Sequence, residues 1–297
     1  MRDKRVLLLG TTGTLGSHLA GALSSQFHVL APRSRNARVV PMASGVSWLS
    51  TSIDAARQIG LDRIIAESRP DAIVNCIAVT AGSGCADDHV ACVSVNSLFP
   101  HRLAEASRNY GCHLIHISTD GVFSGKGGNY SESDLPDPQD LYGRSKLAGE
   151  VIDKDCLTLR TSFFGPSPTG RGLVEWLIAH RGARIQGYTD YIFTGLSTTA
   201  VSRAIIAVLA RATRLSGLYH LGGSAMSKYD LLVMLSRKLQ LGITIDPVAV
   251  GAVDRSLNSA RFWAAIESAP PLLEQMVEDV QLELDAAHRC GTYRGAC

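Results

Sequence analysis

VLLLGTTGTLG, residues 6–16, joins an apolar run to three glycines with the spacing GxxGxxG. The apolar run predicts a buried strand over residues 6–10, and residues 16–25 predict the helix that follows. Glycines at such a junction permit a tight turn and the close approach of a pyrophosphate, while the helix N-terminus offers unpaired N–H groups. A purely structural turn is the alternative, but the place of the junction so near the N-terminus favours a dinucleotide-binding loop.

Short apolar runs and longer helical patterns alternate through the first half of the chain. The runs lack a polar–apolar alternation, which is typical of strands buried on both faces of a parallel sheet. This rhythm predicts an α/β fold, a Rossmann-type doubly wound parallel sheet with helices on both faces. Further strands are expected over residues 28–31, 46–49, 72–77, 113–118 and 157–161, and helices over residues 54–67, 91–110 and 142–152.

The second expected strand ends in APRSR, residues 31–35, without an acidic residue. An Asp or Glu at this place would bind the ribose hydroxyls of NAD. Arg33, Ser34 and Arg35 instead suit the 2′-phosphate of NADP, because a guanidinium group binds phosphate through two parallel hydrogen bonds. The alternative is that both arginines are solvated loop charges. We therefore expect NADP (NADPH) as the cofactor.

Beyond about Gly165 the pattern changes, since prolines and glycines punctuate a loop. A smaller, mainly C-terminal substrate-binding lobe is expected there, interleaved with the main domain. We predict that residues 1–165, together with about 195–221, form the NADP-binding Rossmann domain, and that residues 166–194 and 222–297 form the lobe. In this part of the chain we expect a helix over residues 173–180, a loop over 182–199, a helix over 199–212, a strand over 217–221, and then helices and turns.

The composition is that of a globular protein, with 45% hydrophobic and 19% charged residues among 297 and a formal net charge of +2. No dense Lys/Arg tract indicates a nucleic acid, and no apolar run is long enough for a membrane span. No spacing suits a metal site. The seven cysteines form no CxxC pair, which favours free thiols and a cytoplasmic protein.

Tyr142 and Lys146 lie four residues apart in an expected helix, and therefore on one face of it. A neighbouring cation favours the phenolate and brings the pKa of the phenol, ordinarily about 10, closer to neutrality. Ser118 and Thr119 follow an expected strand, where side chains face the cofactor crevice of a doubly wound sheet. Either hydroxyl would polarise a substrate carbonyl. A surface tyrosine and lysine are the alternative, which the nearby hydroxyls disfavour.

Three segments together resemble the dTDP-4-dehydrorhamnose reductase family of extended short-chain dehydrogenases/reductases. They are STDGVFSG (residues 118–125), YSESD (130–134) and YGRSKLAGE (142–150). The family carries an STDYVFDG-like stretch, a YxExD loop and a YGxSKxxGE helix. The resemblance covers most of residues 4–165. It implies an NADPH-dependent reductase of a keto group, expected at C4, of a nucleotide-activated deoxy-sugar, in the synthesis of a cell-surface polysaccharide or glycoconjugate.

The resemblance also implies roles for individual residues. Thr119 would orient the carbonyl, Tyr142 would donate the proton, and Lys146 would hold the cofactor ribose. Besides Tyr142 and Lys146, the expected cofactor contacts are Gly10, Thr12, Gly13, Thr14, Leu15, Gly16, Arg33, Ser34, Arg35, Asn75, Ala78, Thr80, Thr161 and Ser162. Expected substrate contacts are Ser118, Thr119, Val122, Phe123, Trp176 and Arg255. For Trp176 and Arg255, the alternatives are buried packing and a surface charge.

The chain departs from the family pattern at several places, which leaves the identity of the sugar open. Gly121 and Ser124 replace the usual Tyr and Asp, and Ser256 stands where Pro is usual. One alternative is a nucleotide-sugar epimerase or dehydratase with bound NAD, which the missing acid after the second strand disfavours. Another is a non-catalytic regulatory protein on the same fold, like the regulatory subunit of methionine adenosyltransferase. Many relatives form dimers, so a homodimer is a further expectation.

Overall fold

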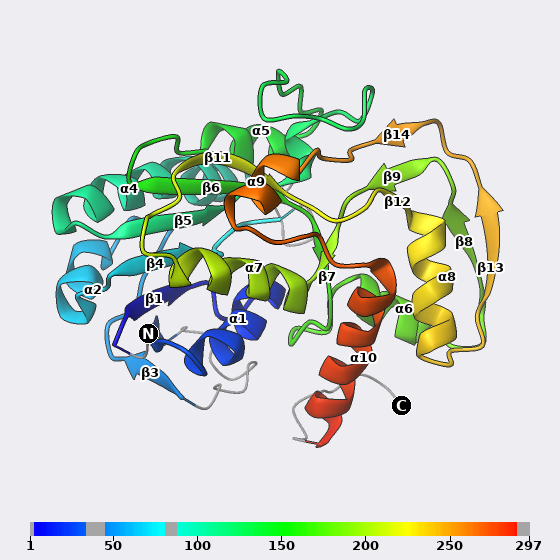
Figure 1. The fold of residues 1–297 in the computed structure, drawn as a ribbon, viewed down its shortest axis with the longest axis horizontal. Coiled ribbons are helices and arrows are strands. Elements are labelled where there is room, and N and C mark those ends of the chain that lie inside the picture. The colour runs from blue at the N-terminus through cyan, green and yellow to red at the C-terminus, as the bar shows by residue number, and fades with distance from the viewer. Residues whose placement is uncertain (1–2, 34–44, 81–87, 290–297) are drawn as a thin grey trace.

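Seven strands form the central sheet of the protein (Figure 1), whose computed structural model describes residues 3–33, 45–80 and 88–289. Ser34 and Arg35 lie outside the described residues. The strands are β1 (Arg5–Leu9), β2 (His28–Pro32), β3 (Val46–Leu49), β4 (Ala72–Asn75), β5 (His113–Ile117), β6 (Cys156–Thr161) and β11 (Gly217–Leu221). All neighbours are parallel, in the order β11-β6-β5-β4-β1-β2-β3. The Rossmann-type prediction is confirmed, and the strand order reverses between β1 and β4, where doubly wound folds bind ligands.

Helices cover both faces of this sheet (Figure 1). They are α1 (Thr14–Ser24), α2 (Leu61–Ser68), α3 (His89–Val93), the π-helical turn Ser94–Leu98, α4 (Phe99–Tyr110), the short helix Asp120–Val122, α5 (Leu141–Ala148) and α7 (Thr198–Ala210). Val6 and Leu8 of β1 share a hydrophobic cluster with α1 and α7. Leu7 and Leu9 share another with α2 and α4. Alternate residues of β1 thus enter different cores, which explains why the strand is apolar throughout.

The helix expected over residues 54–67 begins only at Leu61, so its first half was predicted wrongly. Gly60 precedes it with a φ of +89°, a left-handed conformation that interrupts any helix. A Cβ atom on Gly60 would lie 2.4 Å from the carbonyl oxygen of Ser52. The close approach of these two segments therefore requires glycine and forces a turn before the helix.

The helix expected over residues 142–152 also ends early, at Ala148. A Cβ atom on Gly149 would lie 1.9 Å from the carbonyl oxygen of Asn96. Because Asn96 lies in the π-helical turn between α3 and α4, the end of α5 packs directly against the backbone of that turn. The contact fixes α5, which carries the predicted catalytic residues.

Short strands and helices follow the main sheet in the second half of the chain. They are β7 (Phe163–Phe164), α6 (Leu173–Ala179), β8 (Arg184–Tyr188), β9 (Tyr191–Phe193), β10 (Leu196–Ser197), β12 (Met226–Ser227), α8 (Lys228–Lys238), β13 (Thr244–Val248), β14 (Val253–Asp254), α9 (Ala260–Ala265) and α10 (Leu273–Arg289). β9 pairs with β12 and β14, β8 with β13, and β10 with β7. The loop expected over residues 182–199 is therefore wrong. Its strands are short and pair with segments distant in sequence, so no local pattern indicated them.

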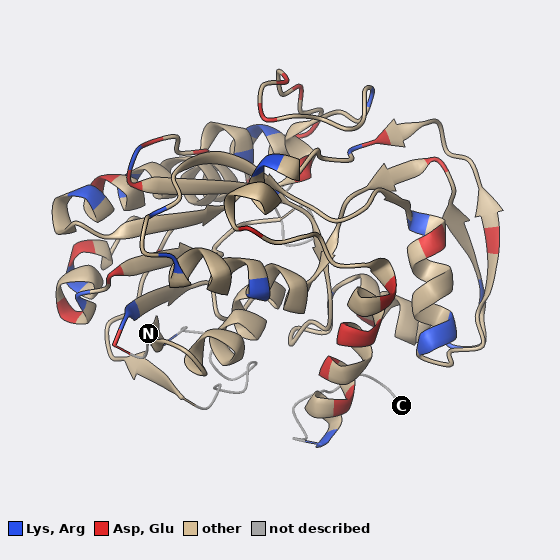
Figure 2. Ribbon diagram, in the orientation of Figure 1, with Lys and Arg blue, Asp and Glu red and all other residues tan. Residues whose placement is uncertain are grey.

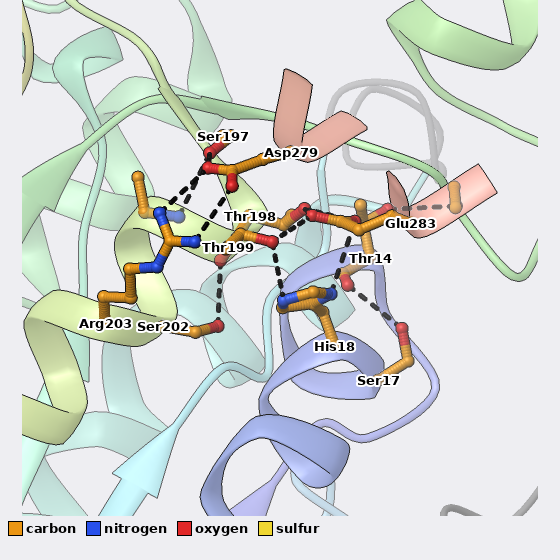
Figure 3. A network of polar contacts seen from close by, with 12 residues as sticks. Thr14, Ser17, His18, Ser197, Thr198, Thr199, Ser202, Arg203, Asp279 and Glu283 are labelled. Carbon is orange, nitrogen blue, oxygen red and sulfur yellow. Dashed lines mark hydrogen bonds and ion pairs between the residues drawn. The ribbon is translucent and has the colours of Figure 1, made fainter. Parts of the chain in front are cut away.

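Several acidic residues lie along α10 (Figure 2), and two of them join this helix to α1 and to the residues around the start of α7 (Figure 3). Asp279 accepts a hydrogen bond from Oγ of Ser197 at 2.9 Å. Glu283 accepts one from Thr199 and lies 3.3 Å from Nδ1 of His18. Since His18 belongs to α1, the C-terminal helix is tied to the helix that follows the glycine loop.

The described cysteines differ in state. Cys76, Cys112 and Cys156 have free thiols, but Cys92 is disulfide-bonded, so the prediction of free thiols is wrong at that position. Burial raises the pKa of Cys76 to about 12 and that of Cys156 to about 11, so both thiols are protonated at neutral pH. Among residues 3–33, 45–80 and 88–289, no helix has the length and apolar character that crossing a membrane requires.

Candidate active site

The glycine loop between β1 and α1 brings backbone segments into close contact. Gly10 has a φ of +88°, and a Cβ atom there would lie 2.7 Å from the carbonyl carbon of Cys76. A Cβ atom on Gly16 would lie 2.2 Å from the carbonyl oxygen of Gly10. Both positions therefore require glycine. Gly13 precedes α1 without a side-chain cap, so the first turn of the helix can offer its N–H groups to an anion.

A cavity of about 320 Å³ extends from the glycine loop to the end of β2. Thr12, Arg33 and Ala78, three of the residues predicted to bind the cofactor, line it. Thr80 is exposed at the end of a described range. Asp54 also lines the cavity, and sequence reasoning missed it. Because Asp54 lies in a turn after β3 that was predicted as helix, the sequence pattern gave no signal that it would face this cavity.

Three other predicted cofactor contacts have side chains directed elsewhere. Leu15 is 3% exposed and packs in the core. Oγ1 of Thr14 donates a hydrogen bond to Oγ of Ser167 at 2.9 Å. Asn75 is fully buried, and its Nδ2 lies 3.1 Å from Nδ1 of His116. Only the backbone of Leu15 and Asn75 is left to approach a cofactor.

Tyr142 and Lys146 lie one turn apart on α5, as the spacing predicted. Lys146 is 2% exposed, and its Nζ donates a hydrogen bond to the carbonyl oxygen of Ile117 at 2.7 Å. Burial lowers the pKa of this amine to about 8. The amine interacts with the thiol of Cys76, whose backbone abuts the glycine loop. Lys146 is therefore close to the backbone segment that contacts the glycine loop.

The phenol of Tyr142 is hydrogen-bonded to Thr119. Burial raises the pKa of Tyr142 to about 12, and the bond with Thr119 offsets only part of this rise. The nearby carboxylates of Asp120 and Asp140 raise the pKa further. From the sequence we expected Lys146 to bring the pKa of Tyr142 down, whereas burial dominates in the structure. At neutral pH the phenol is protonated, which suits a proton donor.

The two hydroxyls that follow β5 have different partners. Oγ of Ser118 donates to Glu150 at 2.7 Å, and Glu150 forms two 2.8 Å bonds with Arg160. The side chains of this ion pair are only 4% and 3% exposed. Thr119 instead lies beside Tyr142, and its Oγ1 accepts the N–H of Gly121 at 3.1 Å. Of the two hydroxyls, that of Thr119 lies beside Tyr142, and that of Ser118 belongs to the buried ion pair.

A charged cluster, defined here as Asp120, Lys228 and Arg255, lies next to Thr119 and was only partly predicted. Burial raises the pKa of Asp120, and the positive charges of Lys228 and Arg255 oppose that rise. Nζ of Lys228 lies 3.9 Å above the ring centroid of Phe193. Arg255 has a buried Nε that finds no hydrogen-bond partner among the described residues. Lys228 begins α8 in a segment without a motif, so only tertiary structure reveals it.

The remaining predicted contacts are dispersed. Val122 and Phe123 are fully buried and pack with Leu257 in a hydrophobic cluster. Neither side chain is therefore exposed to a substrate. Trp176 is 41% exposed on α6, with its ring 4.6 Å from that of His180. Ser162 hydrogen-bonds Asp120 of the charged cluster. Thr161 is 2% exposed at the end of β6.

Comparison with known proteins places this geometry in a family. The family model described as the RmlD substrate binding domain matches residues 4–259. The chain belongs to this family. The match confirms the resemblance to dTDP-4-dehydrorhamnose reductases, and α10 lies beyond the matched range.

Curated relatives and solved structures agree with membership of the RmlD family. A dTDP-4-dehydrorhamnose reductase of Mycobacterium tuberculosis is 32% identical over 200 residues, which are 64% of this chain and 60% of the relative. A probable dTDP-4,6-dihydroxy-2-methyloxan-3-one 4-ketoreductase of Streptomyces antibioticus is 31% identical over 245 residues, 79% of this chain and 77% of the relative. The match with the first relative thus spans less than two thirds of its length.

Two solved structures have the same fold. A hypothetical dTDP-4-dehydrorhamnose reductase from Sulfolobus tokodaii has a TM-score of 0.76 at 25% identity, covering 92% of this chain and 98% of its own. A dTDP-4-dehydrorhamnose reductase from Bacillus anthracis, solved in complex with NADP, has a TM-score of 0.79 at 22% identity. It covers 95% of this chain and 99% of its own. At that identity the second likeness shows the fold alone.

Proposed function

We propose that the protein is an NADPH-dependent reductase of the extended short-chain dehydrogenase/reductase type. Its substrate would be a nucleotide-activated deoxy-sugar with a keto group at C4, used to make a cell-surface polysaccharide or glycoconjugate. The observation that carries the proposal is the set Thr119, Tyr142 and Lys146, in which the phenol of Tyr142 lies beside the buried Thr119. The buried amine of Lys146 interacts with Cys76, whose backbone contacts the glycine loop. Relatives named as a dTDP-4-dehydrorhamnose reductase and a 4-ketoreductase support the same class of reaction.

The catalytic residues would handle the carbonyl oxygen and its proton. NADPH, when bound, supplies the hydride. Thr119 would donate a hydrogen bond to the carbonyl oxygen and orient it. Tyr142, protonated at neutral pH, would give its proton to the oxygen as negative charge develops there. The ammonium form of Lys146 would hold the nicotinamide ribose and stabilise the resulting phenolate.

The glycine loop and the N-terminus of α1 would hold the cofactor pyrophosphate, and Arg33 would bind the 2′-phosphate. Ser34 and Arg35 remain predicted contacts. Asp54, in the same cavity, is the observation that favours the runner-up, a nucleotide-sugar epimerase or dehydratase with bound NAD, since carboxylates bind the ribose hydroxyls of NAD. Arg33 at the end of β2 favours NADPH.

The charged cluster would bind polar groups of the nucleotide sugar beside the reacting carbon, because it adjoins Thr119 and carries a surplus positive charge. Its members Lys228 and Arg255 come from the part of the chain, residues 222–297, that we propose as substrate-binding lobe together with residues 166–194. Residues 1–165 with about 195–221 would form the NADP-binding domain. The cytoplasmic location and the homodimer stay predictions.

The proposal is tested by following NADPH absorbance with dTDP-4-dehydro-sugars, in the wild type and in Tyr142→Phe. Phenylalanine keeps the ring and removes the proton that the alkoxide needs. We expect turnover to fall by about 10²- to 10⁴-fold, with the NADPH affinity, measured by nicotinamide fluorescence, nearly unchanged. Unchanged turnover in the variant would exclude the proposed proton donor. Binding of NADH rather than NADPH would favour the epimerase or dehydratase.

A further inference from the structure

Two buried residues, Asn75 and His116, connect the backbone after β4 to the catalytic amine. The N–H of Ile77 donates to Oδ1 of Asn75 at 3.1 Å, which fixes the orientation of the amide. Nδ2 of Asn75 consequently faces Nδ1 of His116 at 3.1 Å. Because an amide nitrogen only donates hydrogen bonds, Nδ1 of His116 has to be the acceptor.

This contact determines the tautomer of His116. The ring is fully buried, and burial lowers its pKa well below the ordinary value, an effect that the positive charges of Lys146 and His101 strengthen. A neutral imidazole that accepts at Nδ1 carries its hydrogen on Nε2. Nε2 lies 3.5 Å from Nζ of Lys146, at the long limit of a hydrogen bond. His116 therefore presents an N–H, not a lone pair, to the amine.

We propose that Asn75 and His116 are positioning residues for Lys146: they aim this N–H at its amine, disfavour the ammonium form, and set the pH at which the enzyme loses its catalytic cation. The inference rests on the proposed function, in which the ammonium form is the active one. A neutral amine can accept from Nε2 of His116 and still donate to the carbonyl oxygen of Ile117, which lies 2.7 Å away. An ammonium can make only the second bond.

The charges around Lys146 leave room for this effect. Burial is the largest influence and lowers the pKa of Lys146 to about 8. Glu150 and Cys76 act in the opposite direction. However, Glu150 is already paired with Arg160, and the buried thiol of Cys76, with a pKa of about 12, is uncharged at neutral pH. The dipole of His116 thus adds to burial rather than competing with a strong opposing charge.

The sign of the pH response follows from these contacts. Reduction needs the ammonium, so turnover falls as the pH rises through the pKa of Lys146. Removing the N–H with His116→Met raises that pKa and moves the fall to higher pH. Asn75→Asp acts in the same direction, because a carboxylate accepts the hydrogen at Nδ1 and turns the lone pair of Nε2 towards the ammonium.

The first test is the pH profile of kcat at saturating NADPH in the wild type, His116→Met and Asn75→Asp. We expect the alkaline midpoint to move up by about half a pH unit or more in both variants. His113→Met is the matched control, since His113 is a buried histidine of the same strand whose Nε2 bonds the carbonyl oxygen of Leu215 at 2.8 Å. It should leave the midpoint unchanged. An unmoved midpoint in folded His116→Met would overturn the inference.

The second test does not depend on turnover. Two-bond ¹H–¹⁵N correlation spectra report the tautomer of each histidine ring, and the His116→Met spectrum assigns the signals of His116. We expect a neutral ring with its hydrogen on Nε2 over the neutral and alkaline range, from about pH 7 upward. A hydrogen on Nδ1, or titration within that range, would refute the inference. A different tautomer of His116 would refute the inference, whereas unchanged turnover in Tyr142→Phe would refute the proposed function. The two failures are therefore distinguishable.

Discussion

Lys146→Met is predicted to stabilise the fold while it removes activity. Methionine has a similar length and apolar volume but no amine to bury, and Lys146 is 2% exposed. The pKa of this amine is 10.5 ordinarily and about 8 in the folded protein, a difference of about 2.5. At about 1.4 kcal/mol per pKa unit, burial of the ammonium costs roughly 3 kcal/mol. The variant should therefore gain up to about 3 kcal/mol in free energy of unfolding at pH 7, less the lost bond to Ile117.

The pH dependence supplies the sharper test. Below about pH 8 both states bind the proton, so the wild type bears the full cost. Between about 8 and 10.5 the unfolded chain binds more protons than the folded one, so wild-type stability rises with pH and the advantage of the variant shrinks. Urea denaturation of both proteins at about pH 7 and 9.5 measures this, because other titrating groups cancel in the difference. The exposed Lys154→Met should differ from wild type by no more than about 0.5 kcal/mol at either pH.

A Lys146→Met variant that is less stable than the wild type at pH 7, or an advantage that grows with pH, would refute the reasoning.

Three further predictions follow from the same contacts. Arg33→Ala should weaken NADPH binding by about 10- to 100-fold, the loss of a charged hydrogen bond, and leave NADH binding unchanged; fluorescence titration measures both, and equal losses would mean that Arg33 does not bind the 2′-phosphate. Glu150→Ala should lower the free energy of unfolding by about 3–5 kcal/mol because it leaves the buried Arg160 unpaired, whereas Glu150→Leu with Arg160→Met should cost much less; urea unfolding in which the double variant is the less stable would contradict the ion-pair argument. Lys228→Met should raise KM for the nucleotide sugar without changing the Kd of NADPH; steady-state kinetics that show the reverse would remove the charged cluster from the substrate site.

Much of the cofactor half was predictable because its constraints are local in the sequence. The glycine loop is recognisable in the sequence because glycine is required wherever an added Cβ atom would collide with neighbouring backbone, as at Gly16. The buried parallel strands follow from uninterrupted apolar runs such as that of β1. Tyr142 and Lys146 share a helix face by spacing alone. In each case, residues that are close in the sequence determine the structural feature.

The features of the site that could not be predicted from the sequence depend on contacts between segments that are far apart in the chain. Asp54 lines the glycine-loop cavity from a segment where the pattern indicated a helix, although α2 begins only after Gly60. Lys228 reaches the charged cluster through the packing of α8, which no motif marks. From the sequence, Ser118 and Thr119 were equivalent candidates. In the structure Oγ of Ser118 donates to Glu150 of the buried ion pair, which distinguishes the two. Val122 and Phe123 stand next to the catalytic segment in sequence and yet point into the core.

The proposed function requires that a hydride passes from NADPH to a sugar carbonyl. The most direct measurement uses NADPH deuterated at C4 of the nicotinamide, with a dTDP-4-dehydro-sugar as substrate, and locates deuterium in the product by NMR. We predict deuterium on the carbon of the former ketone, with one NADP⁺ formed for each alcohol, and loss of both in Tyr142→Phe. A sugar that is rearranged or dehydrated without consuming NADPH, and without deuterium at that carbon, would contradict the assignment as a reductase.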